Sequence, residues 1–251
     1  IEMMALIPDL DLTLTTNGAL LTKEKSVALK AAGLQRVTVS LDSLNDDIFV
    51  SLNDVKFSVD EVINGINNAA SAGLYPIKIN MVVMRSVNLS SVVPMAKYFR
   101  DSGHILRFIE YMDVGDSNGW RLDEVVPSSE IVELIGAQLP LEPIAPNYSG
   151  EVASRWRYVD GSGEIGLISS VSQPFCGDCS RLRLSARGEL FTCLFASSGH
   201  DVRSLLKSNA SDKTIVDAVA SIWRNRDDRY SELRSKQSQR VSRVEMSYIG
   251  G

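Results

Sequence analysis

Polar and apolar residues alternate in short segments along the first part of the chain, and longer segments with helical spacing lie between them. The alternating segments predict strands at residues 10–16, 36–40, 76–83 and 104–112. The intervening segments predict helices at residues 23–32, 58–72, 94–102 and 129–137. Gly33 and Gly73 are expected to end the first two helices. Ser58 and Glu61 form a capping box, and Ser128 is the expected N-cap of the last helix.

Strands that alternate with helices favour parallel pairing, with the helices outside the sheet. Four such units are too few for a closed barrel but suit part of one, and a doubly wound sheet is the structural alternative. The chain becomes irregular between residues 139 and 150, where it carries Pro140, Pro143 and Pro146. We therefore expect two domains, residues 1–139 and 140–251, with a hairpin at residues 155–168 in the second.

The predicted strands are polar on one face, which is unusual for a parallel sheet. Side chains alternate between faces, so Lys78 and Asn80 share one face while their apolar neighbours take the other. Thr13 and Thr15, and likewise Thr38 and Ser40, repeat this pattern on the earlier strands. A lysine within a strand is costly to bury without an anionic partner. Either a neighbouring carboxylate or a bound phosphate or carboxylate ligand would satisfy it.

Composition limits the possible partners of the chain. Its 251 residues are 44% hydrophobic and 23% charged, an ordinary globular mixture, and the formal net charge is −5. An acidic chain offers no general electrostatic attraction for nucleic acid or an anionic membrane. No apolar run approaches the ~18 residues of a membrane span, and no signal peptide is visible. We therefore expect neither nucleic acid nor membrane as a partner.

All three cysteines of the chain lie within residues 176–193. Cys176 and Cys179 form a Cys-x₂-Cys pair, and the residues from 182 to 194 predict a hairpin that returns Cys193 to it. Three interpretations are open. His200 could complete a Cys₃His zinc site, the three thiolates could hold an iron–sulfur cluster with one iron open, or two could form a disulfide. A cluster of so few cysteines favours a reducing compartment.

Two arginines follow the Cys-x₂-Cys pair. Arg181 and Arg183 are two residues apart on the predicted strand, so they share one face while Leu182 and Leu184 take the other. Two adjacent guanidinium groups suit a polyphosphate, because each can bind oxygens with two nitrogens. Surface arginines without a ligand are the plainer alternative, but their position beside a metal site favours a substrate pocket.

Farther along, Ser211 predicts the cap of a helix through residue 226. Ile215, Val219, Ile222 and Trp223 fall on one side of it, and we expect that stripe to lie in the core.

The cysteine stretch resembles the carboxy-terminal cluster motif of the GTP 3',8-cyclase family of radical S-adenosylmethionine enzymes. The similar residues are Cys-Gly-Asp-Cys-Ser-Arg-Leu-Arg-Leu at 176–184 and Gly-Glu-Leu-Phe-Thr-Cys-Leu-Phe at 188–195. Shorter motifs with the family's order occur along the rest of the chain, at residues 15–18, 40–42, 78–80, 107–112 and 250–251.

The resemblance implies a fold and a reaction. The fold would be an incomplete (βα)6 TIM-type barrel lacking its first units, followed by an α+β domain with an iron–sulfur cluster. The enzyme would be a lyase that cyclises GTP to (8S)-3',8-cyclo-7,8-dihydroguanosine 5'-triphosphate in molybdenum cofactor biosynthesis. Two alternatives are another radical S-adenosylmethionine enzyme with an auxiliary cluster, such as a peptide maturase, and a non-catalytic zinc-binding module.

The resemblance also implies ligands for individual residues. A [4Fe–4S] cluster would be held by Cys176, Cys179 and Cys193. GTP would be bound by Thr16, Lys78, Arg181, Leu182 and Arg183. S-adenosylmethionine would contact Ser40 and Met112, and the double glycine Gly250-Gly251 would reach towards the active site.

One part of the family pattern is absent from the sequence. The Cys-x₃-Cys-x₂-Cys motif, which holds a second [4Fe–4S] cluster and cleaves S-adenosylmethionine, does not occur, and neither does the Gly-Gly-Glu-Pro strand. Both are expected before Ile1, so the chain is predicted to be an amino-terminally truncated part of the enzyme and inactive alone. The implied partner is the next enzyme of the pathway, cyclic pyranopterin monophosphate synthase. A homodimer is also expected, located in the cytoplasm, or in the mitochondrial matrix if the source is eukaryotic.

Overall fold

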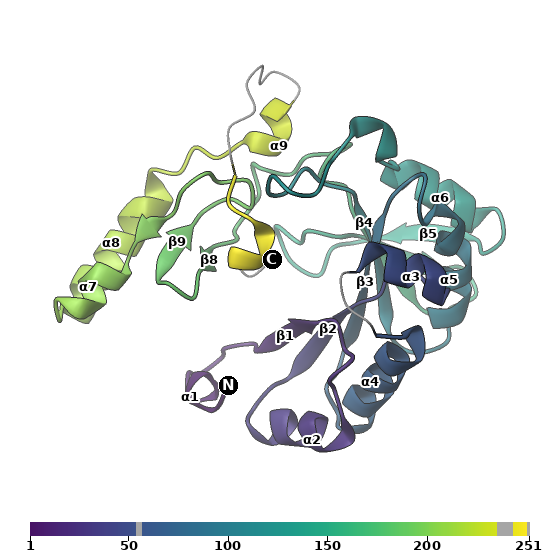
Figure 1. The fold of residues 1–251 in the computed structure, drawn as a ribbon, viewed down its shortest axis with the longest axis horizontal. Helices are drawn as coiled ribbons and strands as arrows, with labels where there is room; N and C mark the ends of the chain where they lie inside the picture. Colours follow the sequence, from purple (N-terminus) through teal and green to yellow (C-terminus); the bar gives the residue numbers. More distant parts are fainter. Residues whose placement is uncertain (54–56, 235–242, 250–251) are drawn as a thin grey trace. The chain divides into compact units, whose positions relative to one another are not determined.

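The structure, a computed structural model, describes residues 1–53, 57–234 and 243–249. Within it the chain forms two compact units (Figure 1). Unit 1 comprises residues 1–111 and 123–172, and unit 2 comprises residues 112–122 and 173–251. Gly250 and Gly251, which are expected to reach towards the active site, lie outside the described residues.

Unit 1 is built on a seven-stranded sheet with the order β1-β2-β3-β4-β7-β6-β5. Strands β1 to β4 and β7 are parallel, and β6 and β5 add an antiparallel hairpin at one edge. The strands are β1 (Thr13–Thr16), β2 (Arg36–Ser40), β3 (Ile77–Val83), β4 (Ile105–Glu110), β5 (Leu141–Ile144), β6 (Ser154–Tyr158) and β7 (Glu164–Ile168). The four predicted strands and the hairpin at 155–168 are confirmed.

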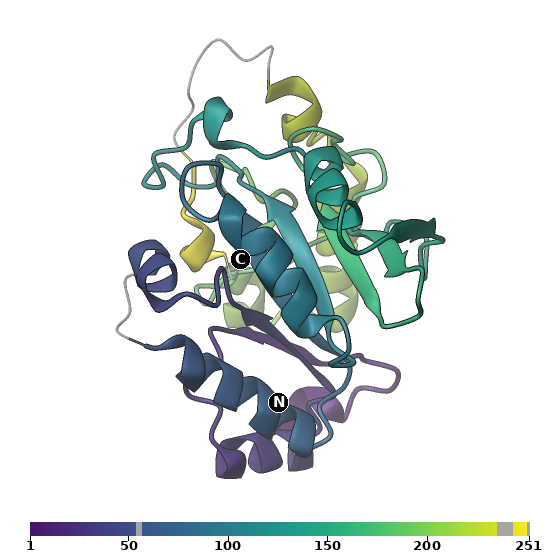
Figure 2. The ribbon, with the colours of Figure 1, turned by 90° about the vertical axis from the view of Figure 1, so that its right-hand side faces the viewer.

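Helices cover one face of this sheet. Strands β1 to β4 follow one another without reversal, so right-handed crossovers place every connecting helix on the same side. Helix α4 packs on β2 and β3, and α5 and α6 pack on β4 (Figure 2). A doubly wound sheet needs a reversal of strand order, and among these strands there is none. The helices are α1 (Glu2–Ala5), α2 (Lys23–Ala31), α3 (Asp46–Leu52), α4 (Val59–Ser71), α5 (Val92–Phe99) and α6 (Ser128–Gly136), with short 3₁₀ turns η1 (Leu89–Ser91) and η2 (Leu122–Glu124).

Local signals set most helix ends. Ser58 and Glu61 form the predicted capping box at the start of α4. Gly33 and Gly73 adopt positive φ values of 99° and 79° after α2 and α4, as their helix-ending role requires. The prediction for Ser128 was wrong, because Pro127 is the N-cap of α6 and the Ser128 hydroxyl donates to the buried Glu110 carboxylate instead.

The core of unit 1 lies between the sheet and its helices. On this face of the central strands, the side chains that are at most 1% exposed include Val37, Val39, Ile77, Ile79, Met81, Leu106 and Phe108. The opposite face of the same strands carries half-buried polar groups, as the alternation predicts.

Glu110, at the end of β4, is fully buried and joins three segments of unit 1. Its carboxylate accepts hydrogen bonds from the backbone and hydroxyl of Ser128 and of Ser172, and from the backbone N–H of Val171. Because these five hydrogen bonds reach one fully buried carboxylate, Glu110 is a structural junction between β4, α6 and the end of unit 1.

The expected domain boundary after residue 139 falls inside unit 1. Strands β5, β6 and β7 follow that point in the sequence, yet they complete the first sheet. The prolines of residues 140–146 interrupt regular structure without separating two cores. Pro143 lies in the edge strand β5, which has no neighbouring strand on its outer side, so a residue without an N–H is tolerated there.

Unit 2 contains a small sheet with the order β10-β9-β8. Its elements are β8 (Arg183–Leu184), β9 (Glu189–Phe191), β10 (His200–Asp201), α7 (Arg203–Lys207), α8 (Asp212–Arg224), α9 (Tyr230–Leu233) and the 3₁₀ turn η4 (Met246–Tyr248). The antiparallel β8–β9 pair confirms the predicted hairpin, and Ser211 caps α8 as expected. The apolar stripe of α8 is only half-buried, so its assignment to a core was wrong.

Unit 2 contains an ionic cluster centred on Asp113. The Asp113 carboxylate is buried and accepts hydrogen bonds from Arg234 Nε and Arg243 Nη1, each over 2.9 Å, and from the Tyr230 hydroxyl. Both guanidinium groups also lie over the Phe195 and Tyr230 rings. Residues from three separate parts of the sequence are therefore held together by one carboxylate.

Candidate functional site

The polar face of the first sheet brings several predicted residues into register. Thr38 and Lys78 are paired neighbours on β2 and β3, and Ser40 and Asn80 are the next such pair on the same face. Arg107, in register with Asn80 on β4, donates from Nε to the Asn80 Oδ1 atom over 2.9 Å. Lys78 and Ser40, predicted as separate ligand contacts, thus share one surface with Arg107.

A cavity of about 400 Å³ opens on this face at the amino-terminal end of the strands. Its lining includes four basic side chains. Arg36 is paired with Asp11, and Arg155 is paired with Glu164. Lys78 and Arg107 have no ion-pair partner in the part of unit 1 that the structure describes. No carboxylate lies within ion-pair distance of Lys78 there, although Glu151 and Asp11 line the same cavity, and an anionic ligand would satisfy both cations.

Burial is the main cause of the altered proton affinity of these two groups. It lowers the pKa of Lys78, and the positive charges of Arg107 and Arg36 lower that pKa further, while the negative charges of Glu151 and Asp11 offset part of the decrease. Burial likewise lowers the pKa of Arg107. Each cation therefore favours a bound anion that would compensate for lost hydration.

Thr16 and Met112 lie elsewhere. Thr16 ends β1 in register with Val39, which belongs to the helix-covered face, and its hydroxyl accepts a hydrogen bond from the Gly18 N–H. Met112 begins the first segment of unit 2, is half-buried, and its carbonyl accepts a hydrogen bond from the Asn118 amide. Thr16 and Lys78 are consequently not neighbours on one face, although both belong to unit 1.

The cysteines of unit 2 are all free and half-buried. Cys176 and Cys179 are joined by a turn in which the Cys179 N–H donates to the Cys176 carbonyl over 3.3 Å. Cys193 follows β9, so the hairpin returns it towards them, and its sulfur accepts the Phe195 N–H over 3.4 Å. Among the described residues, no three His, Cys, Asp or Glu side chains are gathered closely enough to hold a single metal ion.

His200 does not complete a ligand set with the cysteines. It lies exposed on β10, in register with Leu190 of β9, and lines a separate hollow with Asp201 and Asp228. The Cys₃His zinc hypothesis therefore lacks its fourth ligand in this arrangement.

The thiols differ in electrostatic environment. Burial is the largest effect on Cys179 and raises its pKa, but the N–H and guanidinium of Arg181 outweigh it and bring the pKa below the usual value. Burial raises the pKa of Cys193. The Cys179 sulfur is therefore the one best prepared to carry negative charge.

The two predicted phosphate-binding arginines have different surroundings. Arg181 donates from Nε and Nη2 to the Cys179 sulfur over 3.2 and 3.1 Å. Arg183 is half-buried, and burial together with the Arg181 charge lowers its pKa. Leu182 and Leu184 are 39% and 62% exposed, so exposed leucines alternate with half-buried arginines, although only Arg183 and Leu184 belong to β8. The side chains alternate in exposure as predicted, and the Arg183 guanidinium could bind an anion.

Three residues of these sites were missed by the sequence analysis. Arg107 carries the same signal as Lys78, a basic residue within a strand, and could have been found by it. Phe175 lies beneath the Arg181 guanidinium, and Arg226 donates to the Cys179 carbonyl. No local pattern marks these last two, because their partners are set by tertiary packing.

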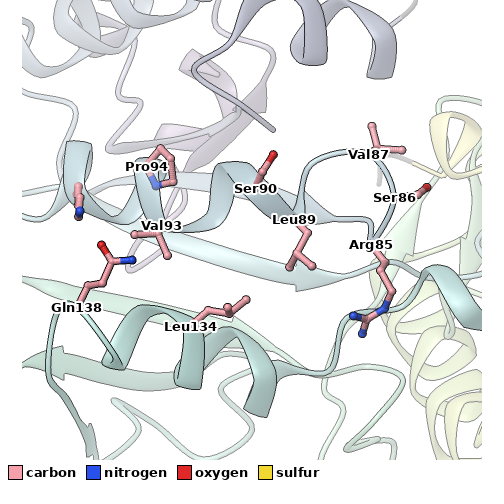
Figure 3. Close-up of a pocket in the computed structure, with 10 residues that line it drawn as sticks. Arg85, Ser86, Val87, Leu89, Ser90, Val93, Pro94, Leu134 and Gln138 are labelled. Carbon is pink, nitrogen blue, oxygen red and sulfur yellow. The ribbon is translucent and has the colours of Figure 1, made fainter.

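A further hollow lies on the helix-covered side of unit 1, between α5 and α6 (Figure 3). Leu89, Val93 and Leu134 form its apolar part, and Arg85, paired with Glu130, lies at one end. It contains none of the predicted ligand contacts.

Two family models match the chain. The Molybdenum Cofactor Synthesis C model matches residues 104–232, and the Radical SAM superfamily model matches residues 1–99. No described helix is long and apolar enough to cross a membrane.

Curated relatives match over nearly the whole chain. A GTP 3',8-cyclase of Acidothermus cellulolyticus is 50% identical, with 100% of this chain and 76% of that protein covered. One of Xanthomonas campestris pv. campestris is 49% identical, with 96% and 70% covered. One of Synechococcus sp. (strain WH7803) is 44% identical, with 96% and 72% covered. Among solved structures, a radical SAM methyltransferase from Sphaerobacter thermophilus aligns with 50% of this chain and 37% of its own at 17% identity and a TM-score of 0.39, too low to support an argument.

Proposed function

The chain belongs to the GTP 3',8-cyclase family, within the radical SAM superfamily, and on this premise we propose that it binds GTP for cyclisation in molybdenum cofactor biosynthesis. The product would be (8S)-3',8-cyclo-7,8-dihydroguanosine 5'-triphosphate. Of this function, GTP binding is the step for which the chain contains the proposed residues. The radical step of the family uses the Cys-x₃-Cys-x₂-Cys motif, which the sequence does not contain.

Unit 2 would hold a [4Fe–4S] cluster through Cys176, Cys179 and Cys193. Three free thiols suit this cluster, and the nearby guanidinium groups of Arg181 and Arg183 would offset its negative charge. Each thiolate binds a different iron, so a cubane needs its ligand sulfurs farther apart than a single ion does. When bound, the cluster would offer one iron without a cysteine ligand to the guanine end of GTP.

Each unit, taken by itself, carries residues proposed to contact GTP. In unit 2, Arg181 and Arg183 would bind phosphate and Leu182 would contact the nucleotide. In unit 1, Lys78 would bind phosphate and Thr16 would contribute its neutral hydroxyl. We add Arg107 to this set, because it lies beside Lys78, is half-buried and has no ion-pair partner among the described residues. Ser40 and Met112 would contact S-adenosylmethionine.

The same family argument extends to the finer architecture and to partners. Unit 1 would be part of an incomplete (βα)6 barrel, since its crossover helices all cover one face, and unit 2 would be the cluster domain. A second [4Fe–4S] cluster would accompany the missing cysteine motif. The product would pass to cyclic pyranopterin monophosphate synthase. The enzyme would be a homodimer in the cytoplasm, or in the mitochondrial matrix if the source is eukaryotic.

The observation that carries the proposal is the half-buried, unpaired Lys78 beside Arg107, within the part of unit 1 that the structure describes. Replacing Lys78 with glutamine should weaken GTP binding to the reconstituted chain by about 10- to 100-fold, the value of one lost charge-assisted contact of about 1.5–3 kcal/mol. Isothermal titration calorimetry under anaerobic conditions measures this. Lys97→Gln is the matched control, because it removes the same charge from an exposed position on α5.

Equal affinities of the two variants would contradict the role of Lys78. Metal analysis of the wild-type chain tests the cluster separately, with about four irons per chain expected. One zinc and no iron would instead support a non-catalytic zinc-binding module.

A further inference from the structure

Arg181, just before β8, and Arg183, the first residue of β8, are both half-buried but have different partners. Both Nε and Nη2 of Arg181 donate to the sulfur of Cys179, over 3.2 and 3.1 Å. The central carbon of this guanidinium lies 4.9 Å from the centre of the Phe175 ring. In the described part of unit 2, no hydrogen bond or ion pair holds the guanidinium of Arg183. The first arginine is therefore committed to a cysteine, whereas the second is available.

The three cysteine sulfurs also differ in the donors they receive. Cys193 accepts one neutral backbone N–H, from Phe195 over 3.4 Å. Among the described residues, no donor reaches the sulfur of Cys176. Cys179 receives two N–H groups from a full positive charge, and Arg226 donates to its carbonyl oxygen. The stabilisation of negative charge is thus concentrated on one of the three thiolates.

We propose that Arg181 is a positioning residue that acts through Cys179, fixing this sulfur and raising the midpoint potential of the cluster that the three cysteines would hold. The inference rests on the proposed function, since it requires that cluster. Hydrogen bonds to a ligand sulfur and a nearby positive charge both stabilise the reduced form of an iron–sulfur cluster, which carries one more electron.

The geometry also explains why arginine occupies this position. A guanidinium presents two N–H groups in one plane, and the face of this one lies over the Phe175 ring. The stacking on Phe175 therefore orients the N–H groups towards Cys179. A lysine would keep the charge but not the paired donors or the stacking. Arg181 would thus act on the cluster through Cys179 in addition to the phosphate contact proposed for it, whereas Arg183 would make the phosphate contact alone.

The test is a redox titration of the reconstituted 251-residue chain, followed by electron paramagnetic resonance and carried out without nucleotide. At the wild-type midpoint potential, Arg181→Lys should show a ratio of reduced to oxidised cluster about tenfold below that of the wild type. This corresponds to a midpoint lower by about 59 mV for a one-electron couple. Arg181→Gln should shift it further, because it also removes the charge.

Arg183→Gln is the matched control, since it removes an equal charge two residues away without removing a hydrogen bond to sulfur. Its shift should be smaller than that of Arg181→Gln. A midpoint of Arg181→Lys equal to that of the wild type, or an equal shift in Arg183→Gln and Arg181→Gln, would overturn the inference. If the Arg181 variants lose iron, the midpoint potential of Phe175→Leu tests the inference instead, because this variant keeps both arginines and removes only the ring beneath Arg181.

The outcome for Phe175→Leu is then a lower midpoint if the inference holds and an unchanged one if it does not. Failure of the proposed function looks different: the wild-type chain itself would bind no four-iron cluster. A wild-type cluster whose potential is indifferent to Arg181 contradicts this inference alone.

Discussion

Gly65, on the buried side of α4, faces the carbonyl oxygen of Gly18. A Cβ atom at residue 65 would lie 2.1 Å from that oxygen, closer than any non-bonded contact allows. Gly18 itself has a positive φ of 78° and donates to the Thr16 hydroxyl, so the turn after β1 and the middle of α4 are packed backbone to backbone.

We expect Gly65→Ala to lower the free energy of unfolding by about 2–3 kcal/mol. The new methyl group meets a backbone atom that cannot rotate away, so overpacking outweighs the usual helix preference of alanine. Gly136→Ala is the control, because this glycine ends α6 and a methyl group there would meet no atom within 4 Å. It should be neutral or stabilising by up to about 1 kcal/mol. Denaturant unfolding of both variants checks this, and equal effects would contradict it.

Glu110→Gln should destabilise unit 1 by about 3 kcal/mol. An amide offers one oxygen to a junction in which a carboxylate accepts five hydrogen bonds, and its NH₂ group would face the donors of Val171 or Ser172. Glu133→Gln, on the exposed side of α6, should change stability by less than about 0.5 kcal/mol. Chemical denaturation compares the two, and a loss in Glu133→Gln as large as that in Glu110→Gln would show that the junction is not responsible.

Asp113→Asn should destabilise unit 2 by about 3 kcal/mol at pH 7, because two buried guanidinium groups lose their carboxylate. Burial is the largest effect on Asp113 and raises its pKa, but the Tyr230 hydroxyl, Arg234 and Arg243 together bring the pKa below its ordinary value. A lowered native pKa contributes stability that is present above the unfolded-state pKa and is lost as the pH falls through the native value. The difference between wild type and variant should therefore shrink below pH ~4. A difference that does not change between about pH 7 and pH 3 would contradict this assignment.

Asp42 should show the opposite dependence. Its carboxylate, just beyond the end of β2, accepts the Val82 N–H, yet burial raises its pKa to about 6. A raised native pKa means that the charged form is disfavoured by folding, so the penalty is present above about pH 6 and disappears as the group is protonated at lower pH. Asp42→Asn keeps an oxygen for Val82 and should stabilise the protein by about 1–3 kcal/mol at about pH 8. The gain should vanish near pH ~4, and thermal unfolding at both pH values measures it; an equal gain at both would refute the prediction.

Much of the fold follows from local sequence patterns. The alternation of Lys78 and Asn80 with Ile77 and Ile79 predicted which face of the sheet is polar, and the Ser58 and Glu61 pair predicted where α4 begins. These predictions succeed because side-chain direction in a strand and capping at a helix end depend only on residues a few positions apart.

Predictions that depended on distant partners were less successful. Ser128 looks like an N-cap, but its hydroxyl donates to the buried Glu110 carboxylate. The hydroxyl therefore does not cap the helix end. The prolines at 140 and 143 look like a linker, yet β5 and β6 pair with the first sheet. In both cases a contact far along the chain outweighs a local preference.

The sequence by itself determined the positions of the cysteines and arginines, their alternation on the strand and the resemblance to a cyclase family. Only the tertiary structure decided that Arg107 lies beside Lys78 without a carboxylate among the described residues, and that Arg181 turns to Cys179 while Arg183 does not. The reason is physical. Spacing along the chain sets the face on which a side chain leaves the backbone, but the partner it finds depends on what packing brings within hydrogen-bond distance.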